Sequence, residues 1–219
     1  MNSNKTIKGL EYDHASLYPN TKTLSSSQVL SLLDDPEGFF MEYRMGQRRP
    51  QSNAMYLGSV FSASYTDRKL KWRPLLEKRN IAPKRIYQEF DNALKILPVI
   101  PKRYCEYPLI CKYKGWKFRA TLDAYHKPSD TNIENKTGQT VWSQERADES
   151  LQITFQNWDK WIKDGKPFAD NLLQWVDFRA TKEKQVQVFH TKRTVEQLQE
   201  FQLLVDQAIK NVEVVNTWI

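Results

Sequence analysis

Two acidic residues and a lysine in the middle of the chain have a spacing that could support the chemistry of phosphate esters. Asp123 ends the segment RATLD (119–123), and Glu134 and Lys136 follow within IENKTG (133–138). Two neighbouring strands joined by a short turn would place Asp123 beside Glu134, and Lys136 would leave the same strand face as Glu134. Carboxylate oxygens are the ligands that Mg²⁺ or Mn²⁺ prefers. The three groups could hold a metal ion, orient a water molecule and stabilise charge on a phosphate, as phosphodiester hydrolysis requires.

The elements expected around these residues could position them in this way, although so short a pattern also occurs at solvated strand edges that carry a salt bridge. The predicted strands are 104–110, 116–125, 131–135, 172–179 and 185–190. The predicted helices start at about residue 24, restart at Pro36, and continue at 54–76, 144–164 and 194–215. This order predicts an α/β fold, with a mixed central β-sheet flanked by helices and an N-terminal helical portion.

Size and composition fit one domain that lies inside the cell. The chain has 219 residues, and we expect residues 1–23 to form a polar lead segment and residues 24–219 a single domain. No apolar run has membrane-spanning length, and the polar N-terminus has no apolar signal core. We therefore expect no membrane partner and a cytoplasmic location, and the compact size would suit a viral source. Two cysteines are too few for an iron–sulfur cluster or a four-cysteine zinc site.

The order of the motifs resembles the RecB-like exonuclease branch of the PD-(D/E)XK nuclease superfamily. In that branch, an acid on one strand precedes a hairpin ending in G-x-I-D, and the next strand ends in D/E-x-K-T-G. The corresponding residues here are Glu106, the segment 120–123 and the segment 134–138. A glutamine on the following helix matches Gln152, although Gln156 stands where the family commonly has an aromatic residue. Upstream, the Ser-rich helix start at 24–27 and the acid-Pro-x-x-F turn at 35–39 are also similar.

The resemblance implies a restriction-endonuclease-like core and a role for each matching residue. Asp123 and Glu134 would be ligands of Mg²⁺ or Mn²⁺, and the Asn135 carbonyl could add a third. Lys136 would position or polarise the attacking water. Gln152 would support the metal ligands or contact DNA, and Glu106 is either a further acid of the site or an ordinary strand residue.

One position departs from the family pattern. The branch usually has a metal-binding histidine four residues after a glycine in an early helix, and here Ser62 stands four residues after Gly58. Serine is a poor metal ligand by comparison. Asp67 falls where some relatives keep an acid and could compensate in part. A full two-metal site is therefore in question, and an inactive relative is an alternative.

The charge of the chain favours a polyanionic partner. The formal net charge is +7 and the sequence pI is about 9.3, so that long-range attraction and counterion release would favour DNA. Trp72 and Tyr65 could stack on unpaired bases, although a solvated basic face with core aromatics would have the same composition. The candidate DNA-binding residues are Arg44, Arg48, Arg49, Lys69, Lys71, Arg73 and Arg119.

The leading hypothesis is a Mg²⁺- or Mn²⁺-dependent deoxyribonuclease, expected to be an exonuclease that acts in replication, recombination or repair. One alternative is a DNA-binding relative of the same fold that no longer cuts. Another is a phage or host-interaction protein whose partner is a protein. The motifs leave the polarity of digestion, the strand preference and the oligomeric state open.

Overall fold

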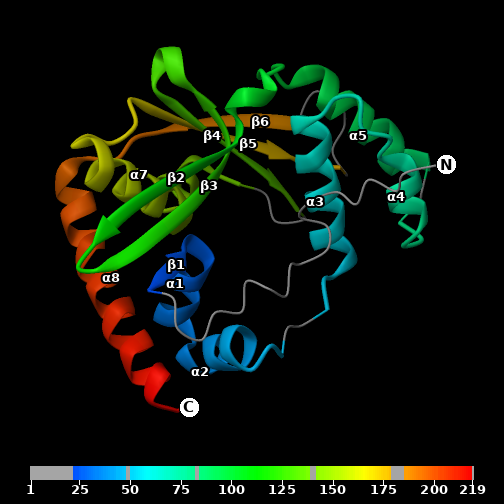
Figure 1. Cartoon of the computed structure of the whole chain (residues 1–219). Coiled ribbons are helices and arrows are strands. Elements are labelled where there is room, and N and C mark those ends of the chain that lie inside the picture. The colour runs from blue at the N-terminus through cyan, green and yellow to red at the C-terminus, as the bar shows by residue number, and fades with distance from the viewer. Residues whose placement is uncertain (1–21, 48–49, 82–83, 139–141, 179–184, 219) are drawn as a thin grey trace.

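A six-stranded mixed sheet forms the centre of the computed structural model (Figure 1), which describes residues 22–47, 50–81, 84–138, 142–178 and 185–218. The strands are β1 (Thr23–Ser25), β2 (Cys105–Tyr113), β3 (Trp116–His126), β4 (Thr131–Thr137), β5 (Asp170–Val176) and β6 (Val186–Thr191). Their order is β1-β3-β4-β5-β6, and β2 pairs with β3. β1 with β3 and β4 with β5 are parallel, whereas the other neighbours are antiparallel.

Helices cover both faces of this sheet, because each face carries apolar side chains that must be removed from water. α1, α7 and α8 pack on one face around Phe118 and Trp158, and α3, α4 and α5 pack on the other around Phe61 and Phe90. The predicted α/β fold with a mixed sheet flanked by helices is thereby confirmed. The helices are α1 (Ser26–Asp34), α2 (Pro36–Phe39), the π-helix η2 (Phe40–Arg44), α3 (Asn53–Thr66), α4 (Arg73–Glu77), α5 (Lys84–Ile96), α6 (Gln144–Asp148), α7 (Leu151–Asp164) and α8 (Val195–Val215).

The hairpin of β2 and β3 is closed by a turn of two residues with positive φ. Lys114 has a φ of 46° and Gly115 a φ of 77°, the combination that matches the twist of a two-residue hairpin. One face of this hairpin packs into the core beneath α7 and α8, and the other face is exposed.

The strands of the hairpin change faces at Asp123. Leu122 and its β2 partner pack on the α7 side of the sheet, whereas Ala124 and its β2 partner pack on the α3 side. Residues two apart on a regular strand share a face, so the alternation breaks between them, at Asp123 and the opposite residue Glu106. Glu106 has a positive φ of 47°, which is uncommon outside glycine and fits a local break in the ladder.

β3 and β4 also separate at this point. Their ladder ends at the pair Ala124–Ile133, while β4 continues along β5 as far as Thr137. On the same edge of β3, β1 pairs only at residues 117–119. Among the described residues, no strand pairs with this edge at 120–123, and the gap is where the candidate site forms.

Several predicted bounds change because of local chemistry. The helix expected at 54–76 is two helices: α3 ends at Thr66, and α4 has Pro74 at its start, where the missing N–H costs nothing. The helix expected at 144–164 is also interrupted, and Ser150 caps α7 through the backbone N–H of Ile153. Of the predicted lead, 1–21 lie outside the described residues, whereas Thr23 belongs to β1.

The capping predicted at the first helix is confirmed. The hydroxyl of Ser25 accepts a hydrogen bond from the backbone N–H of Gln28, and the Gln28 side chain accepts one from the backbone N–H of Ser25. This capping box satisfies two backbone amides that the helix itself leaves free.

Among the helices of the described residues, none is long and apolar enough to cross a membrane.

Candidate active site

The carboxylate of Asp123 fills the gap between β3 and β4. Its Oδ2 accepts a hydrogen bond of 2.7 Å from the backbone N–H of Asn135. A side chain thus replaces the strand that would otherwise satisfy this amide. The bond holds Asp123 beside β4 next to Glu134, which would be its partner if the antiparallel ladder continued by one pair.

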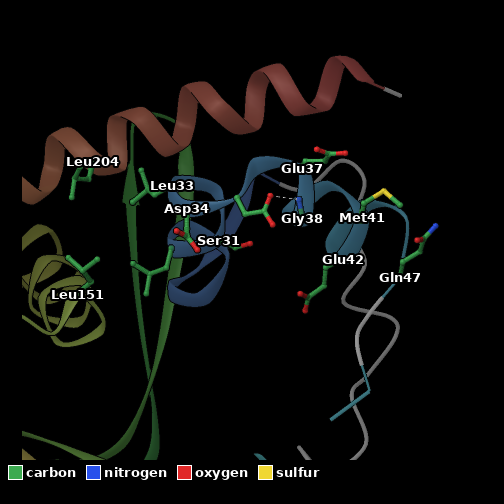
Figure 2. Close-up of a pocket in the computed structure, with 12 residues that line it drawn as sticks. Ser31, Leu33, Asp34, Glu37, Gly38, Met41, Glu42, Gln47, Leu151 and Leu204 are labelled. Carbon is green, nitrogen blue, oxygen red and sulfur yellow. Dashed lines mark hydrogen bonds between the residues drawn. The ribbon is translucent and has the colours of Figure 1, made fainter. Parts of the chain in front are cut away.

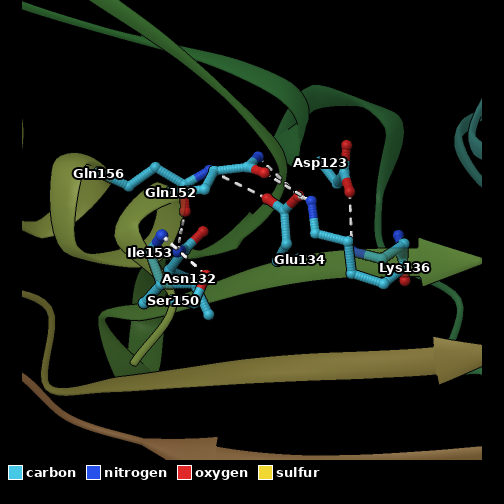
Figure 3. A network of polar contacts seen from close by, with 9 residues as sticks. Asp123, Asn132, Glu134, Lys136, Ser150, Gln152, Ile153 and Gln156 are labelled. Carbon is cyan, nitrogen blue, oxygen red and sulfur yellow. Dashed lines mark hydrogen bonds and ion pairs between the residues drawn. The ribbon is translucent and has the colours of Figure 1, made fainter. Parts of the chain in front are cut away.

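Glu134 lies at the centre of a buried polar network that Figure 3 shows from close by. It is only 3% exposed. Its Oε1 accepts hydrogen bonds of 2.7 Å from both Lys136 Nζ and Gln152 Nε2, and its Oε2 accepts one of 2.9 Å from Gln156 Nε2. Lys136 Nζ also donates to Gln152 Oε1 at 2.5 Å. β4 therefore presents Glu134 and Lys136 on one face, and α7 supplies the two glutamines one turn apart.

A chain of buried amides extends this network into the protein. Asn132 donates to Gln156 Oε1 at 2.8 Å and to Asn171 Oδ1 at 3.1 Å. Asn171 also accepts from Asn157 at 2.8 Å and donates to the carbonyl of Thr191 at 3.0 Å. Because each amide has a fixed donor and acceptor side, the chain fixes which way the Gln156 amide faces.

Sequence reasoning missed these supporting residues. The sequence comparison gave Gln156 no role and noted only that the resembling family commonly has an aromatic residue there. The neighbouring Phe155 packs in the core against Phe118 and Trp158. A signal was present, because Gln156 lies four residues after Gln152 and therefore on the same helix face. Asn132 likewise lies two residues before Glu134 on the same strand.

Burial and like charge raise the pKa of Asp123 to about 8. Desolvation is the largest cause and the charge of Glu134 the next, and the Asn135 N–H and Lys136 oppose them only in part. The pKa of Lys136 is also raised: burial lowers it, but attraction to Glu134 and Asp123 outweighs burial. Without a metal ion, Asp123 therefore keeps its proton at neutral pH, and Lys136 stays protonated.

The donor groups fit a hard cation such as Mg²⁺ or Mn²⁺. Both carboxylates offer oxygen, and a bound divalent ion would favour the ionised form of Asp123, which burial and the charge of Glu134 oppose. Burial and, to a smaller extent, the charges of Cys105 and Asp123 raise the pKa of Tyr65, and its hydroxyl has no hydrogen-bond partner among the described residues. Among the described residues, no three or more His, Cys, Asp or Glu side chains are grouped to hold a metal. Mg²⁺ is usually bound by one or two protein carboxylates, and water and phosphate oxygens complete its coordination shell.

The other predicted acids differ in their surroundings. Glu106 lies opposite Asp123 on β2, is exposed, and contributes to the raised pKa of Asp123. Asp67 follows α3, where its Oδ1 accepts from the backbone N–H of Lys69, and its Oδ2 lies 3.8 Å from Lys102 Nζ. The structure thus brings Glu106 towards the site and gives Asp67 partners in a neighbouring turn.

α3 passes directly beside the end of β4. A Cβ added to Gly58 would lie 2.8 Å from Thr137 Oγ1, so only glycine permits this approach without a shift. Ser62 follows one turn later and is partly buried, and Tyr65 follows three residues after it. The structure therefore places the helix that carries Ser62 at the candidate site.

The predicted DNA-binding residues are spread over the surface. Arg44 donates to Asn216 Oδ1 at the C-terminal end of the chain. Lys69, Lys71 and Arg73 are exposed around the start of α4, where Arg73 pairs with Asp91 at 2.6 Å. Arg48 and Arg49 lie outside the described residues, and Arg119 is exposed on β3.

A pocket lies away from these groups. It has a volume of about 970 Å³ and lies between α1, α2, α7 and α8, with Leu151 and Leu204 at one end and Met41 and Gln47 at the other (Figure 2). Four acids line it, Asp34, Asp35, Glu37 and Glu42. Their charge would repel a polyanion, so its size does not make this pocket the better candidate for a phosphate site.

Comparison with known proteins supports the fold. No family model and no curated protein matches the chain. A crystal structure named "Putative exonuclease", from Eubacterium rectale, matches with a TM-score of 0.63 and 15% identity, over 98% of this chain and 87% of that one. The structure of SSO0001 matches with a TM-score of 0.44 and 12% identity, over 92% of this chain and 80% of that one. The chain thus shares its overall fold with the structure named "Putative exonuclease".

Proposed function

We propose that this chain is a Mg²⁺- or Mn²⁺-dependent nuclease that hydrolyses phosphodiester bonds in DNA, acting as an exonuclease in replication, recombination or repair. The observation that supports this most is the convergence of Asp123, Glu134 and Lys136 where β3 and β4 separate. The similarity of the fold to a structure named as an exonuclease agrees with it.

Each group has a role that follows from its contacts. Asp123 and Glu134 would hold the cation, and the Asn135 carbonyl is proposed as a further oxygen. When bound, a divalent cation polarises a phosphoryl oxygen and lowers the pKa of a bound water. Lys136 is held between Glu134 and Gln152, and because it stays protonated it would donate to the water or the phosphate rather than remove a proton.

Cleavage of end-labelled linear DNA in Mg²⁺ or Mn²⁺ tests this function. Wild type should shorten the DNA from its ends, whereas Lys136→Ala should lose at least a hundredfold in rate. Lys210→Ala removes an exposed charge from α8 and serves as a matched control that should cut normally. Equal cleavage by wild type and Lys136→Ala would refute the proposed mechanism. A covalently closed circle that is cut as fast as linear DNA would refute the exonuclease assignment.

Ser62 favours one alternative, a DNA-binding relative that no longer cuts. Ser62 stands where the resembling family has a metal-binding histidine, and a hydroxyl is a poor replacement for imidazole. This alternative expects salt-sensitive DNA binding without cleavage in any divalent metal. Calorimetric titration with Mn²⁺ separates the two functions, because the non-cutting protein should take up no metal specifically.

A further inference from the structure

We propose that the exposed face of the β2–β3 hairpin binds the phosphates of the DNA that enters the candidate active site. This face, called the hairpin face below, consists of the exposed side chains of Ile110 and Lys112 on β2 and of Lys117, Arg119 and Thr121 on β3. The inference rests on the proposed function and adds to it a path for the substrate.

The hairpin face leads directly to the site. On β3, Lys117, Arg119 and Thr121 alternate with the buried residues of the core. Asp123 follows two residues on, where the strand changes faces and separates from β4, so that this gap joins the hairpin face to the site. On β2, the exposed row ends at Glu106, opposite Asp123. A polyanion lying on this face would meet the cations first and the candidate metal ligands last.

Within the part of the chain that the structure describes, no carboxylate pairs with the cations of the hairpin face. Among the described residues, Lys112, Lys117 and Arg119 form no ion pair, whereas Lys114 in the turn pairs with Asp206 at 2.8 Å. Lys112 and Lys117 are direct partners in the ladder, and like charges in this relation destabilise a sheet. An anion bound between them would remove this repulsion.

The rise per residue along β3 is similar to the rise per base pair along a DNA duplex. A strand rises about 3.4 Å per residue, so Arg119 and Lys117 lie roughly 14 and 20 Å along β3 from Asp123. One strand of B-DNA also advances about 3.4 Å per nucleotide along the axis. A duplex aligned with β3 would therefore place base pairs about four and six from the scissile bond at the level of these two side chains. Because the duplex turns once in about 10 base pairs, the phosphates that face them there belong to whichever strand has turned towards the protein.

Binding of a fluorescent 20-base-pair duplex in EDTA tests the hairpin face without cleavage. The double variant Lys117→Gln/Arg119→Gln should bind at least tenfold more weakly than wild type at 0.1 M salt, and its dependence of log K on log salt should be shallower by about 1.8. The control Lys192→Gln/Lys210→Gln changes the net charge equally at exposed positions elsewhere. Equal affinities and equal salt slopes for the two double variants would overturn the proposal. Circular dichroism melts establish that both fold.

A positional test separates this inference from the proposed function. Neutral methylphosphonates placed on both strands four and six base pairs from the end should weaken binding by wild type but not by Lys117→Gln/Arg119→Gln. Equal weakening of both proteins would overturn the path. A wild type that shows the position effect but never cuts in Mg²⁺ or Mn²⁺ supports the path and refutes the nuclease. A wild type that cuts normally, with no loss of binding in the double variant, leaves the nuclease standing and refutes the path.

Discussion

Gln156 donates a hydrogen bond from Nε2 to Oε2 of Glu134 at 2.9 Å, on the oxygen that Lys136 does not contact. The orientation of this amide is determined by Asn132, whose Nδ2 donates to the other end of it at 2.8 Å. Gln156 is 1% exposed, so water does not compete for either bond. Glu134 is therefore held from the side of α7 as well as from β4.

Replacing Gln156 with leucine should weaken both metal binding and activity. The change removes the hydrogen-bond donor to Glu134 Oε2 and leaves Asn132 Nδ2 with Asn171 Oδ1 as its one acceptor among the described residues, which should cost about 1–3 kcal/mol of stability. Loss of a residue that orients a metal ligand typically lowers metal affinity or activity by about 10- to 100-fold. Mn²⁺ titration and cleavage rates measure these effects. Gln207→Leu, on the exposed surface of α8, should change neither, and unchanged metal affinity in Gln156→Leu would contradict the positioning role.

The metal-free protein should lose stability as the pH rises towards 8. An unfolded aspartate loses its proton near pH 4, whereas Asp123 in the folded state keeps it up to about pH 8. The folded state thus binds more protons between these values, so the free energy of unfolding falls with pH in this window and levels off above it. Asp123→Asn should remove most of this loss, which amounts to about 1.4 kcal/mol for each unit by which the folded pKa exceeds the unfolded one.

Urea denaturation in EDTA at pH 5 and pH 8.5 measures this effect. The difference between the two pH values should be smaller in Asp123→Asn than in wild type. Asp67→Asn, which alters an exposed carboxylate after α3, is a suitable control. Added Mg²⁺ should stabilise wild type at pH 8.5 but not Asp123→Asn, because binding to the folded state alone raises stability. If the free energy of unfolding changes equally with pH in wild type and Asp123→Asn, the carboxyl of Asp123 is not the cause of the loss of stability.

Gly58→Ala should disturb the site by pushing α3 away from β4. Its new Cβ would meet Thr137 Oγ1 at 2.8 Å, and such overpacking typically costs about 1–3 kcal/mol. Because Thr137 follows Lys136 directly, we expect cleavage to fall together with stability. The double variant Gly58→Ala/Thr137→Ala removes the clashing hydroxyl and should recover stability; if thermal melts show no recovery, the contact with Thr137 is not the reason for glycine.

The strands and the principal acids could be predicted from the sequence because their signals are local. Alternation of buried and exposed residues predicts β3. The spacing of Glu134 and Lys136 predicts that both side chains lie on one face of β4, and the hydrogen bond from Lys136 Nζ to Glu134 Oε1 agrees with this. The helix predicted at 54–76 ends sooner, at Thr66, and Pro74 stands at the start of a second helix. The helix predicted at 144–164 is interrupted before α7, which Ser150 caps. Local patterns therefore suffice where one strand or one helix face decides the structure.

The rest of the site depends on pairing between distant segments. β1 is three residues long and exists only because it pairs with Lys117, Phe118 and Arg119. The change of face at Glu106 and Asp123 arises from a positive φ that is not a property of glutamate. The amide chain joins Asn132 to Asn171, which are 39 residues apart. A single sequence read in short windows contains no signal for such contacts.

Ser62→His tests whether α3 can supply the ligand that the resembling family carries there. Ser62 lies on α3 between Gly58, where an added Cβ would lie 2.8 Å from Thr137 Oγ1, and Tyr65, whose pKa is raised by burial and less by the charges of Cys105 and Asp123. Imidazole is a far better ligand for Mn²⁺ than a hydroxyl, so Ser62→His should bind Mn²⁺ at least tenfold more tightly than wild type. Loss of the free-ion signal in electron paramagnetic resonance measures this affinity. Ser62→Gln has a side chain of similar size without imidazole and should bind as wild type does. If histidine and glutamine behave alike, Ser62 does not face the metal, and the missing histidine then gives no ground for an inactive protein.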